Sequence, residues 1–214
     1  MGAEPADRGS RAPARATDAE TATPAAGIPA DPSLRWRAVL GAVIAAAMTV
    51  MDLIMTSTAL GSIQETLHAS LAKGALVISV YATAELVTLS LSAYLTRLFR
   101  PETYLVLLVC CFVGGSLLSA NAWSFESLLV ARVVQGAASG AIMPFAYYLV
   151  VVLMRGREQP KAIAVFSLTV ASTGVLGPVL CITLVGWFGW RALYYVSVPE
   201  GLLVVALAWP GCGR

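Results

Sequence analysis

The sequence predicts an all-α membrane protein, a bundle of six transmembrane helices. Hydrophobic residues make up 58% of the 214 positions, and the mean hydropathy is +0.78. Charged residues account for only 12%, against about 25% in a typical soluble domain. Six separate apolar stretches are each close to the roughly 20 residues that cross a bilayer. A soluble fold of this size could not bury so much apolar surface, so the solvent around most of the chain is lipid.

The same composition excludes several classes of function. The formal net charge of +2 carries no nucleic-acid-binding signature. The four cysteines show neither the spacing of a metal site nor that of a secreted disulfide framework. His68 is the single histidine, and no H-E-x-x-H, G-x-S-x-G or phosphate-binding glycine pattern occurs. We therefore expect no catalytic residue, no metal site and no enzyme activity.

Residues 1–37 differ in kind from the rest of the chain. They contain five arginines, five acidic residues and many Ala and Pro, but almost no large apolar residue. Such a segment cannot bury enough surface to offset its ordering entropy, so we expect a disordered tail. It has no apolar core next to its arginines, which excludes a conventional signal peptide, and it is too acidic for a transit peptide.

Six spans follow, and short charged segments separate them. The last span is the shortest and leads into a short C-terminal end at 210–214. The predicted spans are 38–59, 74–96, 103–121, 126–153, 161–185 and 193–209.

Lys and Arg in the loops predict the orientation, because cytoplasmic loops are enriched in them. With a cytoplasmic N-terminus, eight basic residues lie inside and two, Lys73 and Arg191, lie outside. The inside set is Arg35, Arg37, Arg97, Arg100, Arg155, Arg157, Lys161 and Arg214. Both termini are therefore expected in the cytoplasm. The five tryptophans all fall near predicted span ends, as in an aromatic belt: Trp36, Trp123, Trp187, Trp190 and Trp209.

Asp52 in the first span and Arg132 in the fourth are opposite charges at one depth. Each lies about seven or eight residues from the outer end of its span, which at about 1.5 Å per residue is roughly 10 Å inside the outer boundary. A charge in a span costs about 2.5–3.5 kcal/mol on insertion scales, so we interpret them as paired or facing a cavity. The alternative is that Arg132 extends alone to the interface while Asp52 lies at a frayed helix end.

Glu85 lies eleven residues into the second span, close to mid-membrane. Removal from water favours the neutral form of a carboxyl group, so Glu85 could exchange a proton during a transport cycle. The alternative is a permanently protonated side chain that is hydrogen-bonded to a neighbouring helix.

The fourth and fifth spans contain small residues at helical spacing. Arg132, Gly136 and Gly140 share one face of the fourth span, with Gln135 beside them, and the G-x-x-x-G pair lets another helix approach closely. The fifth span contains three residues that break or loosen a helix: Gly174, Gly177 and Pro178. Either a static kink or a flexing gate helix fits them.

Four patches together resemble motifs of one transporter family. Asp52-Leu-Ile-Met-Thr-Ser-Thr-Ala-Leu60 is similar to D-x-x-I-V-N-V-A-L-P, and Arg132-x-x-Gln135-Gly136-x-x-x-Gly140 is similar to that family's fourth-span motif. Gly174-x-x-Gly177-Pro178 is similar to its antiporter motif, and Trp190-Arg191-x-x-Tyr194 to the start of its sixth span. The chain thus resembles the N-terminal six-span half of a major facilitator superfamily transporter, a 3+3 pseudo-repeat, most similar to the fourteen-span drug:proton antiporter branch.

The loop between the second and third spans departs from this family. The expected G-x-L-A-D-R-x-G-R-K is replaced by Ala93-Tyr-Leu-Thr-Arg97-Leu-Phe-Arg100-Pro101, so Arg97 takes the acidic position. In the family, this loop holds the two halves together in the outward-closed state. Its change here puts the conformational equilibrium in question.

The resemblance implies a function and a set of partners. Asp52, Glu85, Arg132 and Gln135 would serve proton coupling or line the cavity, and the glycines and Pro178 would shape helix contacts. The implied function is proton-coupled efflux of amphipathic organic compounds or drugs across the bacterial inner membrane, with the proton gradient as energy source and no cofactor. Lipid, a small-molecule substrate and a second six-span bundle would be the partners. That bundle could be the chain's own C-terminal half, a second copy or a separate chain.

One alternative is an inactive, truncated fragment. The other is a non-transporting interaction subunit that docks through the glycine-rich faces of the fourth and fifth spans.

Overall fold

The computed structural model describes residues 31–96 and 101–208, and throughout these the chain is helical with short connections. In chain order the elements are α1 (Pro32–Thr58), α2 (Leu60–Thr66), α3 (Leu71–Leu95), α4 (Pro101–Ala120), α5 (Phe125–Leu153), the 3₁₀ turn η1 (Gly156–Glu158), α6 (Gln159–Phe188) and α7 (Arg191–Ala208). The tail up to residue 30, Arg97 and Arg100 of the departing loop, and the end from Trp209 lie outside the described residues.

Six of these helices are long and apolar enough to cross a membrane, as the sequence predicts: α1, α3, α4, α5, α6 and α7. Their described ends agree with the predicted spans to within three residues, with one exception. Helix α1 begins at Pro32, so residues 32–37, which we expected in the tail, are helical. The Asp31 carboxylate accepts a hydrogen bond from the Ser33 backbone N–H at 2.9 Å, and proline is favoured in the first helical turn. The bonds from the Ser33 backbone and hydroxyl hold the pKa of Asp31 below its ordinary value.

Helix α2 is an element that the sequence analysis did not predict. It follows α1 after a break at Ala59 and is held by the buried side chain of Ile63. Serine caps set the starts of two further helices. Ser70 accepts a hydrogen bond from the Lys73 backbone at the start of α3, and Ser124 forms a capping box with Ser127 at the start of α5.

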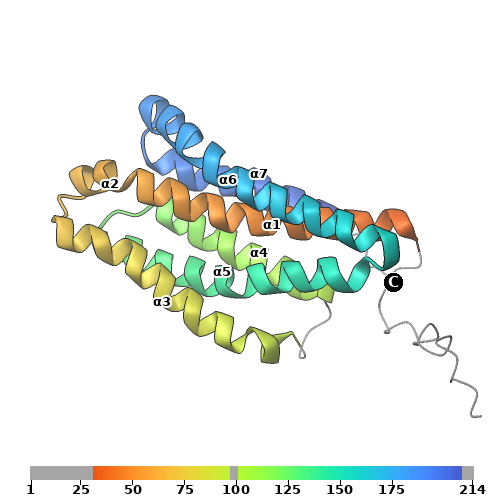
Figure 1. Ribbon diagram of the computed structural model, residues 1–214. Helices are drawn as coiled ribbons and strands as arrows, with labels where there is room; N and C mark the ends of the chain where they lie inside the picture. Colours follow the sequence, from red (N-terminus) through yellow and green to blue (C-terminus); the bar gives the residue numbers. More distant parts are fainter. Residues whose placement is uncertain (1–30, 97–100, 209–214) are drawn as a thin grey trace, which may run out of the picture.

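The long helices run along one common direction and form a single bundle (Figure 1). Helix α5 packs against α3, α4 and α1, while α1 also packs against α6 and α7, and α4 against α7. Helices α1, α4 and α5 are accordingly the most buried spans, whereas α3 and α6 are the least buried. The interior of the bundle is therefore formed mainly by α1, α4 and α5.

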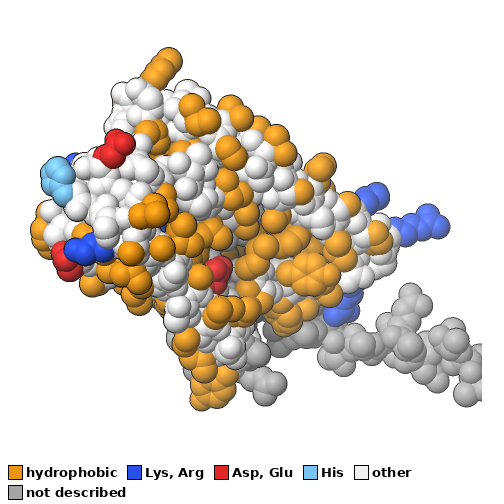
Figure 2. Space-filling model, turned by 60° about the vertical axis from the view of Figure 1, so that its left-hand side comes forward, with side chains coloured by type: hydrophobic (Ala, Val, Ile, Leu, Met, Phe, Trp, Pro, Cys, Tyr) orange, Lys and Arg blue, Asp and Glu red, His pale blue; other side chains and the backbone are white. Residues whose placement is uncertain are grey.

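The surface of the bundle is that of a membrane protein. Hydrophobic side chains dominate the face shown in Figure 2, and most charged groups lie at its two ends, apart from one acidic group near the middle. The described start of α1, the end of α5, the start of α6 and the end of α7 lie together at one end (Figure 1). Arg35, Arg37, Arg155, Arg157 and Lys161 belong to these segments or connect them, so the five described basic residues of the set expected inside share one end.

The tryptophans only partly follow the expected belt. Trp123 and Trp187 are exposed next to helix ends, as expected for side chains at a lipid–water interface. Trp190 is instead buried, and its ring packs edge-on against Tyr194 with centroids 6.1 Å apart. It contributes to packing at the start of α7 and is not part of a belt.

Candidate functional site

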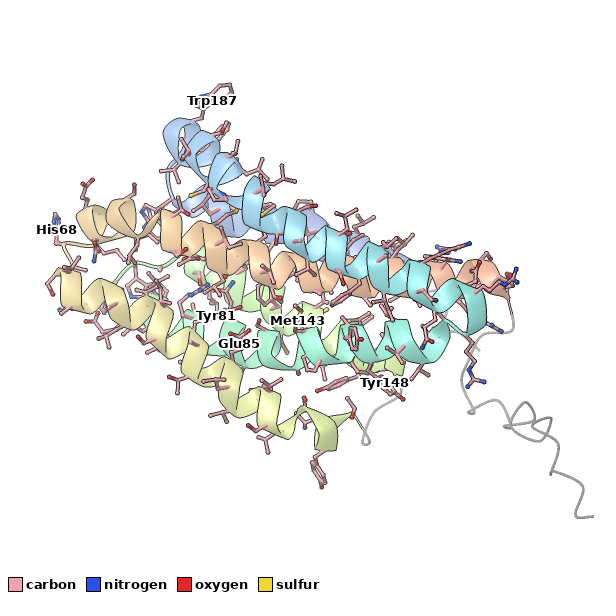
Figure 3. The ribbon with its side chains drawn as sticks, in the orientation of Figure 1. His68, Tyr81, Glu85, Met143, Tyr148 and Trp187 are labelled. Atoms are coloured by element: carbon pink, nitrogen blue, oxygen red, sulfur yellow. The ribbon has the colours of Figure 1, made fainter. Side chains whose placement is uncertain are left out.

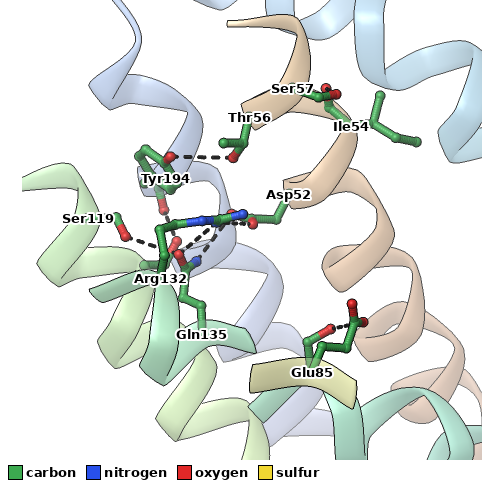
Figure 4. Close-up of polar contacts among 11 residues, drawn as sticks. Asp52, Ile54, Thr56, Ser57, Glu85, Ser119, Arg132, Gln135 and Tyr194 are labelled. Carbon is green, nitrogen blue, oxygen red and sulfur yellow. Dashed lines mark hydrogen bonds and ion pairs between the residues drawn. The ribbon is translucent and has the colours of Figure 1, made fainter. Parts of the chain in front are cut away.

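Asp52 of α1 and Arg132 of α5 form an ion pair inside the bundle. Nη1 of Arg132 donates to Oδ2 of Asp52 at 2.6 Å, and both side chains are buried. The contact joins the two helices (Figure 4). The pairing expected from their matching depth is confirmed, and the alternative in which Arg132 extends alone to the interface is wrong.

Gln135 connects this pair to α4. Its Oε1 accepts hydrogen bonds from Arg132 Nη1 at 2.9 Å and from Ser119 Oγ at 3.0 Å, and its Nε2 donates to Asp52 Oδ1 at 3.2 Å. A Cβ at Gly115 would lie 2.7 Å from Cγ of Gln135, so that glycine makes room for the amide. Three helices thus meet in one buried polar network.

Two tyrosine rings cover the guanidinium group of Arg132. Its Cζ lies 4.2 Å from the centroid of the Tyr81 ring and 5.9 Å from that of Tyr194. The position of Tyr194 is set from two sides, because Thr56 Oγ1 donates to its hydroxyl at 3.4 Å and Ser116 Oγ donates to its carbonyl oxygen at 2.9 Å. The rings supply a cation–π environment in a place where water is excluded.

The guanidinium group retains unused donors. Among the described residues, Nε and Nη2 of Arg132 have no hydrogen-bond partner, although the side chain is fully buried. A buried donor without a partner costs about 1–3 kcal/mol. The stability of this cation therefore depends on Asp52, Gln135 and the two rings.

Replacement of Tyr81 tests the contribution of the ring. We expect Tyr81→Leu to lower the free energy of unfolding by about 2 kcal/mol, since a desolvated cation–π contact is worth about that much. Tyr81→Phe keeps the ring and should stay within about 1 kcal/mol of the native protein. Unfolding by denaturant in detergent measures both variants. Equal loss in the two would show that the hydroxyl group, and not the ring face, stabilises the site.

Three members of this network were missed by the sequence analysis: Tyr81, Tyr194 and Ser119. Tyr81 precedes Glu85 by four residues and so shares its helix face, and Tyr194 stands in the motif at the start of the sixth span. The shared helix face of Tyr81 and the motif position of Tyr194 could therefore have indicated these two residues. Nothing in the sequence singled out Ser119 from the other serines.

Gly136 and Gly140 lie where α5 touches the backbone of α3. A Cβ at Gly136 would collide with the carbonyl oxygen of Tyr81, and one at Gly140 with the carbonyl oxygen of Glu85. The close helix approach expected from G-x-x-x-G is confirmed, with a partner in the same chain. The idea that these glycines offer a docking face to another protein is therefore wrong, because α3 already occupies it.

The three small or helix-breaking residues of the fifth span do not share one environment. A Cβ at Gly177 would lie 2.8 Å from a methyl group of Ile54, so this glycine admits α1. Gly174 has no atom within 4 Å of the position that its Cβ would take. Helix α6 continues through Pro178 to Phe188. Of the two glycines, only Gly177 lies where contacts with described residues leave no room for a larger side chain.

Glu85 and Glu200 are acidic residues that lie well inside their spans and do not belong to the ion pair. Glu85 of α3 accepts a hydrogen bond from Ser139 Oγ of α5 at 3.0 Å (Figure 4). Glu200 of α7 is half-buried. The sequence analysis did not single out Glu200, although it lies ten residues into α7. Among the described residues, no group of three or more His, Cys, Asp or Glu side chains could hold a metal.

Comparison with known proteins agrees with the family resemblance of the sequence motifs. Residues 42–211 match the sequence profile of the Major Facilitator Superfamily. The chain is 28% identical over 170 residues to the multidrug export protein EmrB of Haemophilus influenzae, covering 78% of this chain and 32% of that protein. It is 26% identical over 166 residues to the fatty acid resistance protein FarB of Neisseria gonorrhoeae, covering 78% and 33%. The chain thus spans about a third of the length of the curated relatives it matches.

Proposed function

The chain belongs to the Major Facilitator Superfamily, and from this premise we propose that it is the N-terminal bundle of a proton-coupled exporter of amphipathic organic compounds. The observation that carries the proposal is the buried Asp52–Arg132 pair, which joins α1 to α5 through a 2.6 Å contact. An intramembrane ion pair is costly to insert, and such groups commonly mark proton or substrate pathways. Its relatives are named for multidrug export and fatty acid resistance.

Asp52 is the group that takes up the proton. Its carboxylate accepts from Arg132 and Gln135, so protonation removes the negative charge and weakens both contacts. Arg132 keeps its charge, because a guanidinium group is not deprotonated in proteins. The link between α1 and α5 therefore has two states, paired and released, and a proton selects between them.

A second six-span bundle completes the transport pathway. Transporters of this kind rock one bundle against another around a site near the bilayer midplane. The second bundle is the C-terminal half of a longer polypeptide, a second copy or a separate chain. The membrane is the bacterial inner membrane, with the basic end of the bundle in the cytoplasm according to the excess of Lys and Arg there.

Transport in inverted membrane vesicles tests the proposal. Vesicles that contain the chain together with its second bundle are energised so that their interior becomes acidic, and a quenched acridine dye reports the pH gradient. We expect ethidium or oleate to release protons and restore the fluorescence, because each exported molecule is exchanged for protons. Vesicles without the chain provide the control. If neither compound changes the gradient at a normal membrane level of the protein, the proposed function is wrong.

A further inference from the structure

A cavity lies between α3, α5 and α6. Its volume is about 560 Å³, within the range of about 300–1,000 Å³ that holds small organic molecules. Figure 3 shows Glu85 of α3 and Met143 of α5 close together in this region. The lining residues are Glu85, Leu86, Leu89, Gly140, Met143, Pro144, Tyr147 and Phe166.

Glu85 is the one acidic residue in this lining, and no basic residue lines it. In the described part of the chain the single ion pair is Asp52–Arg132, so no Lys or Arg side chain neutralises Glu85. The hydrogen bond from Ser139 Oγ engages one oxygen, Oε1. The carboxyl group thus lies in an otherwise apolar lining, and its second oxygen, Oε2, is left for a ligand.

An aromatic pair forms another part of the wall. The rings of Tyr147 and Phe166 pack edge to face, with centroids 5.6 Å apart and an interplanar angle of 67°. Aromatic faces attract organic cations through the ring quadrupole, and Met143 adds a polarisable apolar surface. A carboxylate, two rings and a thioether in one cavity are complementary to a cation with a large apolar body.

We propose that this cavity binds monovalent lipophilic organic cations, with Glu85 as the counter-ion and Tyr147 and Phe166 as the aromatic wall. The inference rests on the proposed export function and names its substrate class. An anionic compound such as a fatty acid would be repelled by Glu85. A metal ion would find one carboxylate where it needs several oxygen ligands.

Equilibrium binding of tetraphenylphosphonium to the purified full chain in lipid nanodiscs tests the site. We expect Glu85→Gln to raise its Kd about tenfold or more, because a charge-assisted contact is lost. Glu85→Asp should recover binding to within about threefold of the native protein, and Phe166→Leu should raise the Kd about threefold. Glu200→Gln is the matched control, since it neutralises another half-buried carboxyl outside the cavity lining and should leave binding unchanged. Triphenylphosphine oxide, a neutral analogue, should bind more weakly and with no dependence on Glu85.

Two results would overturn the inference. One is equal tetraphenylphosphonium binding by the native protein and a monodisperse Glu85→Gln variant, and the other is equally tight binding of the neutral analogue. If Glu85→Gln is not monodisperse, an unchanged Kd in Phe166→Leu overturns it instead. Binding that depends on Glu85 without proton exchange in vesicles would reject the transport proposal and retain the site. Proton exchange with oleate by a protein that does not bind tetraphenylphosphonium would reject the cation site and retain the transport proposal.

Discussion

Asp52→Asn is expected to reduce substrate-driven proton exchange to the background of vesicles without the chain. Asparagine keeps the shape of the side chain and can still accept a hydrogen bond from Arg132, but it cannot take up a proton. It also leaves the buried Arg132 cation without a counter-charge. Removing one partner of a buried pair typically costs about 3–5 kcal/mol, so we also expect a lower midpoint of thermal unfolding.

A double variant separates the two effects of Asp52→Asn. In Asp52→Asn/Arg132→Met neither charge remains, so most of the lost stability should return, while proton exchange should stay at background. Glu65→Gln on α2 is the control for loss of an acidic residue, because Glu65 is exposed outside the spans. Native-like proton exchange in Asp52→Asn at a normal membrane level would reject Asp52 as the coupling group.

Gly136→Leu is expected to prevent formation of the native bundle. A Cβ at this position would collide with the carbonyl oxygen of Tyr81, which is backbone and cannot rotate away. Helices α3 and α5 would have to separate, and the Tyr81 ring would then move from its place 4.2 Å from the Arg132 guanidinium carbon. We expect destabilisation of about 3 kcal/mol or more, at or above the upper end of the usual overpacking range. The amount of monodisperse protein recovered from membranes measures it.

Gly174→Leu is the matched control for Gly136→Leu. The substitution is identical and also lies in a long membrane-spanning helix, but nothing stands within 4 Å of the Cβ position at Gly174. Its yield should equal that of the native chain. A similar loss in both variants would mean that the added bulk, and not the contact with α3, determines the result.

The prediction for Asp52→Asn could be made from the sequence because it depends on the depth of two charged side chains in the membrane. Counting residues along two spans placed Asp52 and Arg132 at the same level, and opposite charges at one level in lipid have a strong reason to meet. The place of Gln135 beside Arg132 followed from the spacing of one helical turn, whereas its bonds to Asp52 and Ser119 came only from the structure. The second prediction was accessible only in part, because the G-x-x-x-G pattern indicates a close helix contact without naming the other helix.

Counting residues along the spans could not predict the two tyrosine rings over Arg132 or the cavity at Glu85. Tyr81 precedes Arg132 by about fifty positions and Tyr194 follows it by about sixty, and no spacing rule connects residues so far apart. Likewise, Phe166 meets Tyr147 because of the way α6 returns along α5. The start of α1 was missed for a simpler reason. The Asp31 cap and Pro32 extend α1 beyond the apolar stretch, which is the signal used to find spans.

The sequence by itself determined that this chain has six membrane-spanning helices, because hydropathy over about 20 residues is a local property. It also singled out Asp52, Glu85 and Arg132 as side chains that would be costly in lipid and would need a partner, although it missed Glu200. The tertiary structure alone decided which helix faces which, and so whether a polar side chain lies in a network, in a cavity or at a closed helix contact. The physical reason is the solvent. In water a helix shows its buried face by its apolar stripe, whereas in lipid the outer face is as apolar as the inner one. The rotation of each helix about its axis is then set by the contacts it makes.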